Sequence, residues 1–254
     1  MVSTKVGIFD SGSGGLTVLA SLRQTMPHHD YLYVEDAGFA PYGSHSTSVI
    51  TDRCVKITDY LCQQGVTALV VACNTATVTA IHILRERFAH MSFVGIEPAV
   101  KPAYDITRNG KVAVLATPIT IGSPRLQQLI ELWGAGKETS LFPSASLAQL
   151  IDQPSAMLEL QQELDRIAEQ VKQSQADVLV LACTHYPHVK DSLQQRLPEV
   201  NIIEPSLGVA KRLSSILPIR QHVDTRLMGS VSYFTTGKMR QLGRYPCAPR
   251  EIDI

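Results

Sequence analysis

Short apolar segments alternate with helical segments along almost the whole chain. The apolar runs are continuous, without a polar residue at every second position, which is typical of strands covered on both faces. Strands are expected at 5–9, 31–35, 68–72, 92–96, 111–116, 139–142, 177–182, 201–203 and 230–234. Helices are expected at 16–25, 48–64, 75–88, 124–132, 155–174, 188–196 and 207–217. This order predicts βαβ units and an α/β fold with mainly parallel sheets.

Two proline-containing segments have equivalent local sequences, GIEPAV at 95–100 and IIEPSL at 202–207. Each follows a predicted strand, and we interpret them as the points where the chain leaves one domain and returns to it. The first predicted domain comprises 1–97 and 207–254, and the second comprises 98–206.

Composition narrows the possible partners. Lys plus Arg and Asp plus Glu number 23 each, so the net charge is zero, which argues against a nucleic-acid partner. No stretch approaches the roughly 20 apolar residues of a membrane span, and the apolar run at 6–9 is too short for a signal peptide. The five cysteines form no dense framework. We therefore expect a cytoplasmic protein with reduced thiols and no membrane partner.

Two cysteines stand in matching places in the two halves. Cys73 lies in ALVVACNTAT and Cys183 in DVLVLACTHYP, each between an apolar strand and a turn that contains threonine. In parallel α/β folds, catalytic side chains lie at this end of a strand. Taken alone, such a thiol is more commonly a buried structural cysteine than a catalytic one. Their repetition favours catalysis by two thiols on opposite sides of one substrate.

His185 follows Cys183 by two residues and is a candidate to share a proton with it or with a substrate amine. A second interpretation makes Cys73, Cys183 and His185 the three ligands of a catalytic zinc ion. It ranks lower because the chain lacks a C-x₂-C pair and an obvious supporting carboxylate other than Asp10.

The first predicted strand ends at Asp10 and leads into a glycine-rich loop, FDSGSGGLTV. Such a loop presents N–H groups to an anion, or forms a tight turn capped by the aspartate. Thr17 replaces the last glycine of a dinucleotide fingerprint, and no lysine precedes it as in a Walker A loop. An acidic side chain at an anion site argues for a ligand with both an amino group and a carboxylate.

Other candidates are weaker. APYGS is read from composition as a plain turn. The hydroxyls of Thr117 and Thr120 either hold a carboxylate or cap the next helix. Cys54 and Cys62 are expected to be core or sheltered thiols on one helix face, and Cys247 has no expected role.

Together these motifs resemble the glutamate racemases of the cofactor-independent aspartate/glutamate racemase family. The matching pieces are FDSGSGGLTV, APYGS, ACNTAT, GIEPAVKPA, ATPIT and LACTHYP, in the expected order between 9 and 187. The resemblance implies two pseudo-symmetric α/β domains, each a mainly parallel sheet flanked by helices, with the active site in the cleft between them. It also implies a homodimer that supplies D-glutamate for peptidoglycan and needs no metal, pyridoxal phosphate or nucleotide.

The resemblance further implies roles for individual residues. Cys73 and Cys183 act as the two bases, with Asp10 supporting the first and His185 the second. The implied substrate contacts are Asp10, Ser11, Pro41, Tyr42, Gly43, Cys73, Asn74, Thr75, Thr117, Thr120, Cys183, Thr184 and His185.

The chain departs from the family pattern in three places, one of which is IIEPSLGVA at 202–210, where the commoner version of this segment contains an aspartate. Gln149 is read in SASLAQLID where members often carry a glutamate, and Leu126 where they carry a tyrosine. Three rival functions stay open: a racemase for aspartate or another amino acid, a zinc-dependent hydrolase, and a non-catalytic ligand-binding module.

Overall fold

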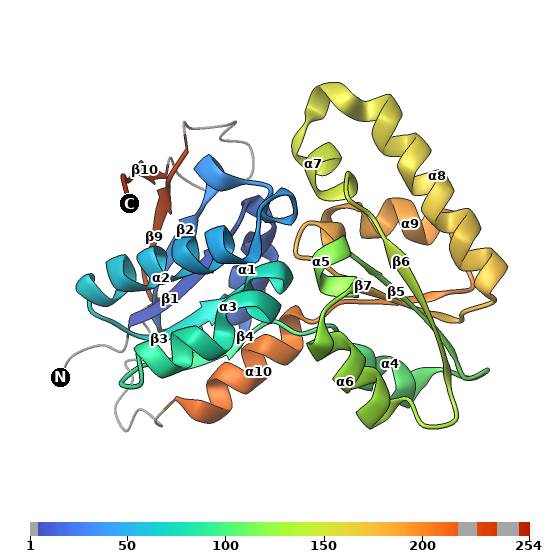
Figure 1. Cartoon of the computed structure of the whole chain (residues 1–254), viewed down its shortest axis with the longest axis horizontal. Helices are drawn as coiled ribbons and strands as arrows, with labels where there is room; N and C mark the ends of the chain where they lie inside the picture. Colours follow the sequence, from blue (N-terminus) through green and yellow to red (C-terminus); the bar gives the residue numbers. More distant parts are fainter. Residues whose placement is uncertain (1–4, 218–227, 238–248) are drawn as a thin grey trace. The chain divides into compact units, whose positions relative to one another are not determined.

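The computed structural model describes residues 5–217, 228–237 and 249–254. The chain forms two compact units (Figure 1). Unit 1 comprises Met1–Ile96 and Ser206–Ile254, and unit 2 comprises Glu97–Pro205. The chain passes between them within the two proline-containing segments.

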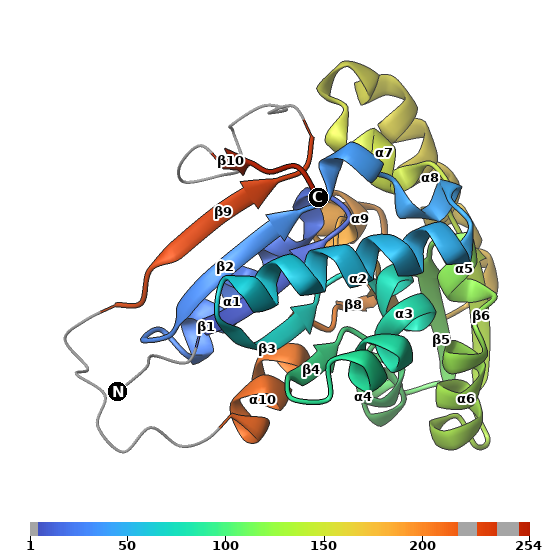
Figure 2. The ribbon, with the colours of Figure 1, turned by 60° about the vertical axis from the view of Figure 1, so that its left-hand side comes forward.

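Unit 1 is built on a parallel sheet with the strand order β10-β9-β2-β1-β3-β4 (Figure 2). Its strands are β1 (Lys5–Asp10), β2 (Asp30–Glu35), β3 (Val66–Val71), β4 (Ser92–Gly95), β9 (Val231–Thr235) and β10 (Arg250–Glu251). The central strands are buried almost throughout, in keeping with their continuous apolar sequences.

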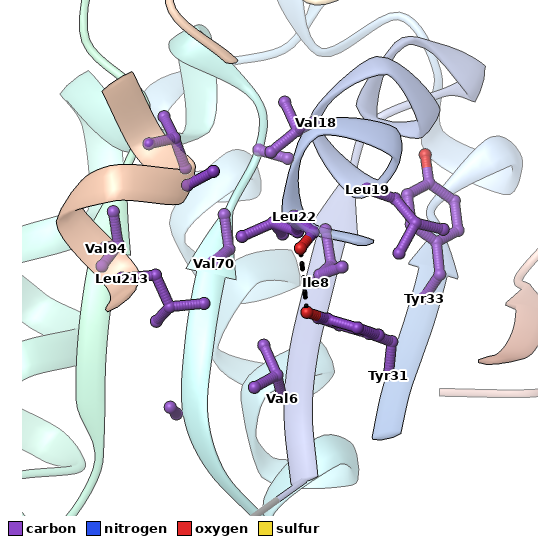
Figure 3. Packing of buried hydrophobic residues seen from close by; sticks show 14 of the residues in the cluster. Val6, Ile8, Val18, Leu19, Leu22, Tyr31, Tyr33, Val70, Val94 and Leu213 are labelled. Atoms are coloured by element: carbon purple, nitrogen blue, oxygen red, sulfur yellow. Dashed lines mark hydrogen bonds between the residues drawn. The ribbon is translucent and has the colours of Figure 1, made fainter. Parts of the chain in front are cut away.

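Helices cover both faces of this sheet (Figures 1 and 2). One face packs against α1 (Leu16–Thr25) and α10 (Ser206–Ile216), the other against α2 (Thr47–Gln63) and α3 (Asn74–Arg87). In the core beneath α1 and α10, Ile8 and Val70 from the sheet meet Leu22 and Leu213 from the helices (Figure 3). The Tyr31 hydroxyl donates to the Leu22 carbonyl at 3.2 Å, so this buried phenol keeps a polar partner.

Unit 2 is built on a parallel sheet with the order β6-β5-β7-β8. Its strands are β5 (Lys111–Ala116), β6 (Glu138–Pro143), β7 (Val178–Ala182) and β8 (Asn201–Ile203). One face is covered by α4 (Val100–Ile106) and α6 (Pro124–Trp133). The other is covered by α7 (Leu147–Asp152), α8 (Met157–Ser174) and α9 (Lys190–Arg196), and the one-turn α5 (Pro118–Ile121) follows β5.

The two units share one strand pattern. The order β2-β1-β3-β4 in unit 1 corresponds strand by strand to β6-β5-β7-β8 in unit 2. Each unit also holds the helix that follows the last of the four matching strands of the other unit. Helix α4 comes after β4 but packs on α6 and β7, and α10 comes after β8 but packs on α1.

The predicted α/β class with parallel, helix-flanked sheets is confirmed, and every predicted strand and helix is present within a few residues of its expected bounds. The short elements α4, α5, α7 and β10 were not predicted. Cys54 is fully buried, and Cys62 is partly exposed beside His90; Cys247 lies outside the described residues. In the described part of the chain, no helix is long and apolar enough to span a membrane.

Candidate active site

In unit 1, the predicted site residues gather at the carboxyl end of the sheet. Asp10 is the last residue of β1, and Cys73 follows the neighbouring strand β3 by two residues. The Gly15 N–H donates to Asp10 Oδ2 at 2.7 Å, so the glycine-rich loop folds back onto its own aspartate. A Cβ at Gly15 would lie 2.8 Å from Asp10 Cβ and 2.9 Å from the Tyr33 hydroxyl, which explains the glycine at this position.

The Cys73 side chain caps the N-terminus of α3. Its Sγ accepts a hydrogen bond from the Ala76 N–H at 3.5 Å and lies 3.5 Å from Ser11 Oγ. A helix N-terminus and nearby donors stabilise negative charge on a sulfur. The environment therefore suits a thiol that ionises during a reaction.

Asn74, directly after Cys73, has a buried amide whose Nδ2 and Oδ1 both lack a hydrogen-bond partner among the described residues. Buried amide groups in proteins almost always have partners, because leaving them unpaired costs free energy. A polar ligand bound beside Cys73 would satisfy both atoms, as predicted for a substrate contact.

The APYGS segment forms a turn after β2, with a cis peptide bond between Ala40 and Pro41. The Tyr42 side chain points inward, and its hydroxyl donates to Asp36 Oδ2 at 2.7 Å. Burial raises the pKa of this phenol well above its ordinary value, with smaller contributions from Cys54 and Asp36. The phenol hydroxyl is therefore already hydrogen-bonded inside the unit. Tyr42 can still bind a ligand through its main-chain groups. Gly43 is exposed.

In unit 2, Cys183 follows β7 and has His185 beside it. The distance from Cys183 Sγ to His185 Nδ1 is 3.9 Å, and His185 Nε2 lies 3.0 Å from Asp152 Oδ2. Burial by itself lowers the pKa of His185, but the hydrogen bonds and charges of Asp152 and Cys183 outweigh it and raise the pKa well above the ordinary value. A charged imidazole ring thus links a carboxylate to the sulfur.

Asp152 is a site residue that sequence reasoning missed. It is the last residue of α7, in the SASLAQLID segment. The sequence comparison with the family pattern pointed to Gln149, one helical turn earlier, as the position of a supporting glutamate. Gln149 is exposed, whereas Asp152 reaches His185. The signal that could have found it is the aspartate three residues after Gln149, because residues three apart lie on the same side of a helix.

Thr117 and Thr120 act together at the end of β5. The Thr120 N–H donates to Thr117 Oγ1 at 3.4 Å, and the two hydroxyl oxygens are 3.1 Å apart, so the pair caps α5. Leu126, where a tyrosine was expected, is fully buried in the core of unit 2. Its position explains how the chain tolerates the apolar residue, because the side chain belongs to the core.

The two sulfurs occupy equivalent places in the two sheets, since Cys73 follows β3 and Cys183 follows β7. Likewise Asp10 ends β1, and Thr117 follows the equivalent strand β5. Thr75 and Thr184, which lie close after Cys73 and Cys183 in the sequence, are both buried. No group of three or more His, Cys, Asp or Glu in the described ranges is arranged to hold a metal ion.

Known proteins of similar sequence and fold identify the family of this chain. The family model for Asp/Glu/Hydantoin racemase matches residues 16–211. The chain belongs to this family. A glutamate racemase from Ectopseudomonas mendocina (strain ymp) is 38% identical over 239 residues, covering 93% of this chain and 91% of the relative.

Solved structures of racemases are similar to the whole chain. Glutamate racemase isoform RacE1 from Bacillus anthracis has a TM-score of 0.87 at 26% identity and covers 99% of this chain and 98% of its own. Escherichia coli glutamate racemase, solved with L-glutamate and the activator UDP-MurNAc-Ala, has a TM-score of 0.78 at 29% identity and covers 94% and 91%. The fold of this chain is thus similar to that of solved glutamate racemases.

Proposed function

We propose that this protein is a glutamate racemase that interconverts L- and D-glutamate by moving the Cα proton between two cysteines. The observation that carries the proposal is the equivalent placement of Cys73 and Cys183 after matching strands of two similar units. The activity assigned is that of the full-length relatives, of which the chain covers nine-tenths or more in the cases above.

In the proposed mechanism, Cys183 as a thiolate removes the Cα proton of L-glutamate while Cys73 as a thiol delivers a proton to the opposite face. The roles reverse for D-glutamate. Two thiolates facing one substrate would repel each other, so the productive enzyme has one thiol ionised and one protonated. A bell-shaped dependence of kcat/KM on pH follows.

The two bases have different supporting groups. At Cys73, the Ala76 N–H and the helix N-terminus stabilise charge on the sulfur, and Asp10 lies at the end of the adjacent strand. At Cys183, the imidazolium of His185 offers a proton and a positive charge, and Asp152 holds the ring in place. Each half-reaction therefore has its own source of electrostatic support.

We assign the remaining substrate contacts to buried polar groups and exposed main chain near the two sulfurs. The unpaired Asn74 amide and the exposed Gly43 turn supply hydrogen bonds in unit 1, and the hydroxyl of Thr184 supplies one in unit 2. The proposed set is Asp10, Ser11, Pro41, Tyr42, Gly43, Asn74, Thr75, Thr117, Thr120, Thr184 and His185. We keep the proposed domain bounds of 1–97 with 207–254 and 98–206, and catalysis requires that water be excluded from the bound substrate.

The experiment that tests this function is incubation of L-glutamate in heavy water with chelator-treated protein. Loss of optical rotation and deuterium at Cα of the D-glutamate formed are expected. Binding of glutamate without exchange would support a ligand-binding module instead, and loss of activity on chelation would support the zinc interpretation. Parallel assays with aspartate separate the related racemases.

The family resemblance extends the proposal to biology and assembly. The protein supplies D-glutamate for peptidoglycan synthesis in the cytoplasm and works as a homodimer. Light scattering coupled to size-exclusion chromatography checks the dimer by mass, with 27.8 kDa expected for a single chain. Depletion of the protein in its host, with rescue by external D-glutamate, checks the metabolic role.

A further inference from the structure

A buried charge network lies next to the APYGS turn, and apart from Tyr42 its members are not among the proposed site residues. Asp36, directly after β2, is fully buried, and its carboxylate accepts hydrogen bonds from three segments of unit 1. Arg53 donates through Nη2 at 2.7 Å and Nε at 3.1 Å, the Tyr42 hydroxyl donates at 2.7 Å, and Thr236 Oγ1 donates at 2.6 Å.

The Asp36 main chain is fixed to the proposed site as well. Its N–H donates to the carbonyl of Asp10 at 2.9 Å, which continues the β1–β2 ladder to the residue at the centre of the unit 1 site. The main chain that carries this carboxylate is therefore hydrogen-bonded to the end of β1, where the proposed site residue Asp10 lies.

Arg53 holds the opposite side of the same loop. It projects from α2, is 4% exposed, and its guanidinium lies 4.0 Å from the centre of the Phe39 ring. Its Nη1 donates to the main-chain oxygen of Ile254. Burial by itself lowers the pKa of Arg53, but the hydrogen bonds and charge of Asp36 outweigh it and raise the pKa, so the side chain stays charged.

Further contacts restrain the loop at 36–45 along its length. Thr236 Oγ1 accepts from the Gly38 N–H at 3.2 Å, and His45 Nε2 lies 3.0 Å from the Phe39 carbonyl. Gly43, by contrast, faces open space, because a Cβ added there would meet nothing within 4 Å. The loop is thus anchored from behind and left uncovered at the turn.

A buried ion pair is weak evidence for stability, because desolvation offsets most of its attraction. Its value here lies in geometry, since a guanidinium and a carboxylate joined by two hydrogen bonds define both distance and orientation. The Tyr42 phenol transmits that geometry to the turn, because its ring spans the space between Asp36 and the main chain at 41–43.

We propose that Asp36 and Arg53 are positioning residues, which hold the Tyr42 phenol so that the main chain of Pro41, Tyr42 and Gly43 is presented to the substrate in one conformation. Neither side chain touches the substrate. This inference rests on the proposed function for the role of the turn, and it adds the residues that set the geometry of the turn.

The test compares Arg53→Lys and Tyr42→Phe with Ile57→Ala, a control on the same helix. Lysine keeps the positive charge and loses the two-pronged contact, and phenylalanine removes only the hydroxyl. Ile57 is fully buried one turn along α2, and its truncation is expected to lower thermal stability without removing a hydrogen bond to the loop.

For Arg53→Lys, KM for glutamate is expected to rise about 10-fold with kcat changed less than about 3-fold, because ground-state and transition-state binding are lost together. Tyr42→Phe should show a smaller rise in the same direction. Ile57→Ala should leave KM unchanged. Equal KM in Arg53→Lys and the wild type, or an equal rise in Ile57→Ala, would overturn the positioning role.

Amide hydrogen exchange of the unliganded proteins provides a readout that needs no substrate. Residues 37–45 should exchange at least about 5-fold faster in Arg53→Lys than in the wild type, with no such change in Ile57→Ala. Unchanged exchange in Arg53→Lys would also overturn the proposal. If the wild type fails to racemise glutamate, the proposed function is wrong, and the exchange measurement still decides whether this pair anchors the loop.

Discussion

Cys73 and Cys183 have equivalent places but different neighbours. The Cys73 sulfur contacts a neutral hydroxyl and a main-chain N–H, whereas the Cys183 sulfur contacts an ionisable imidazole that is itself bound to a carboxylate. The two half-reactions should therefore respond differently to substitution and to pH, although the sheets that present the two thiols have the same strand order.

Serine substitutions should separate the two directions of proton transfer. We expect Cys73→Ser and Cys183→Ser each to lower racemisation by about 10³-fold or more, because a hydroxyl is a poor acid–base group at neutral pH. Cys73→Ser should retain slow exchange of the Cα proton of L-glutamate in heavy water, and Cys183→Ser that of D-glutamate. Proton magnetic resonance of each enantiomer measures the exchange. Exchange of the opposite enantiomer in each variant would contradict the assignment of the two bases.

The pair of His185 and Asp152 should make stability depend on pH. The pKa of His185 is raised in the folded chain, so below the unfolded value of about 6.5 the ring is charged in both states and the pair contributes fully. Its contribution is lost as pH rises through the raised folded value. We expect Asp152→Asn to cost about 1 kcal/mol between pH 5.5 and 6.5 and progressively less at alkaline pH.

Thermal unfolding between pH 5.5 and 10 measures this difference. The matched control is Asp165→Asn, which removes an exposed ion pair with Arg196. Arginine stays charged over the whole range, so the effect of the control should not vary with pH. If the difference in thermal stability between the wild type and Asp152→Asn did not change with pH, Asp152 would not be the group that stabilises the charged form of His185.

At the scale of single elements, α7 determines whether Asp152 reaches His185. Ser144, just before this helix, accepts from the Leu147 N–H at 3.1 Å and donates to Glu163 at 2.6 Å, and Glu163 pairs with Arg166. The Tyr186 hydroxyl donates to the Ser144 carbonyl at 3.4 Å. The start of α7 is therefore tied both to α8 and to the turn that follows His185.

We expect Ser144→Ala to lower the free energy of unfolding by about 1 kcal/mol, as for the loss of a helix cap. Because α7 carries Asp152, which supports Cys183 in both directions of the proposed reaction, the variant should also lower kcat/KM for the two enantiomers by the same factor, as an equilibrium constant of one requires. Denaturant unfolding and initial rates from both enantiomers measure the two effects. Unchanged kcat/KM in the folded variant would mean that α7 acts on stability alone.

Short helices such as α4 and α7 could not be predicted from the sequence. Long, continuous apolar strands and full-length helices were predicted close to their observed bounds because their own periodicity defines them. Helices α4 and α7 span seven and six residues, too few for a helical period to stand out, and α4 contains Pro102. Asp152 was missed with α7, because its contact with His185 depends on how that helix packs.

The buried network around Asp36 was missed for the same reason. Its members come from α2, from the loop after β2 and from the segment after β9, so they are neighbours only in the folded unit. In contrast, Cys73, Cys183 and Asp10 were found from sequence because each directly follows or ends a recognisable strand. Position at a strand end can be read locally, and contacts between distant segments cannot.

At the scale of the whole molecule, the two units have matching strand orders. Each unit also contains a helix, α4 or α10, that follows a strand of the other unit. Helix α4 completes unit 2 by covering the β5–β7 face with Val100, Ala103 and Tyr104, all buried. The Tyr104 hydroxyl also lies 2.5 Å from Thr139 Oγ1 on β6. Without α4, the part of that face that α6 does not cover would be open to water.

This packing predicts where unit 2 can be cut. A fragment of residues 97–205 should unfold cooperatively in denaturant, because both faces of its sheet are covered. A fragment of 108–205 should not, because each large apolar side chain lost from the core removes about 1.5–3 kcal/mol from a typical total of about 5–15 kcal/mol. Circular dichroism during urea unfolding distinguishes the two. Cooperative unfolding of the shorter fragment would show that α4 is dispensable and that unit 2 begins at β5.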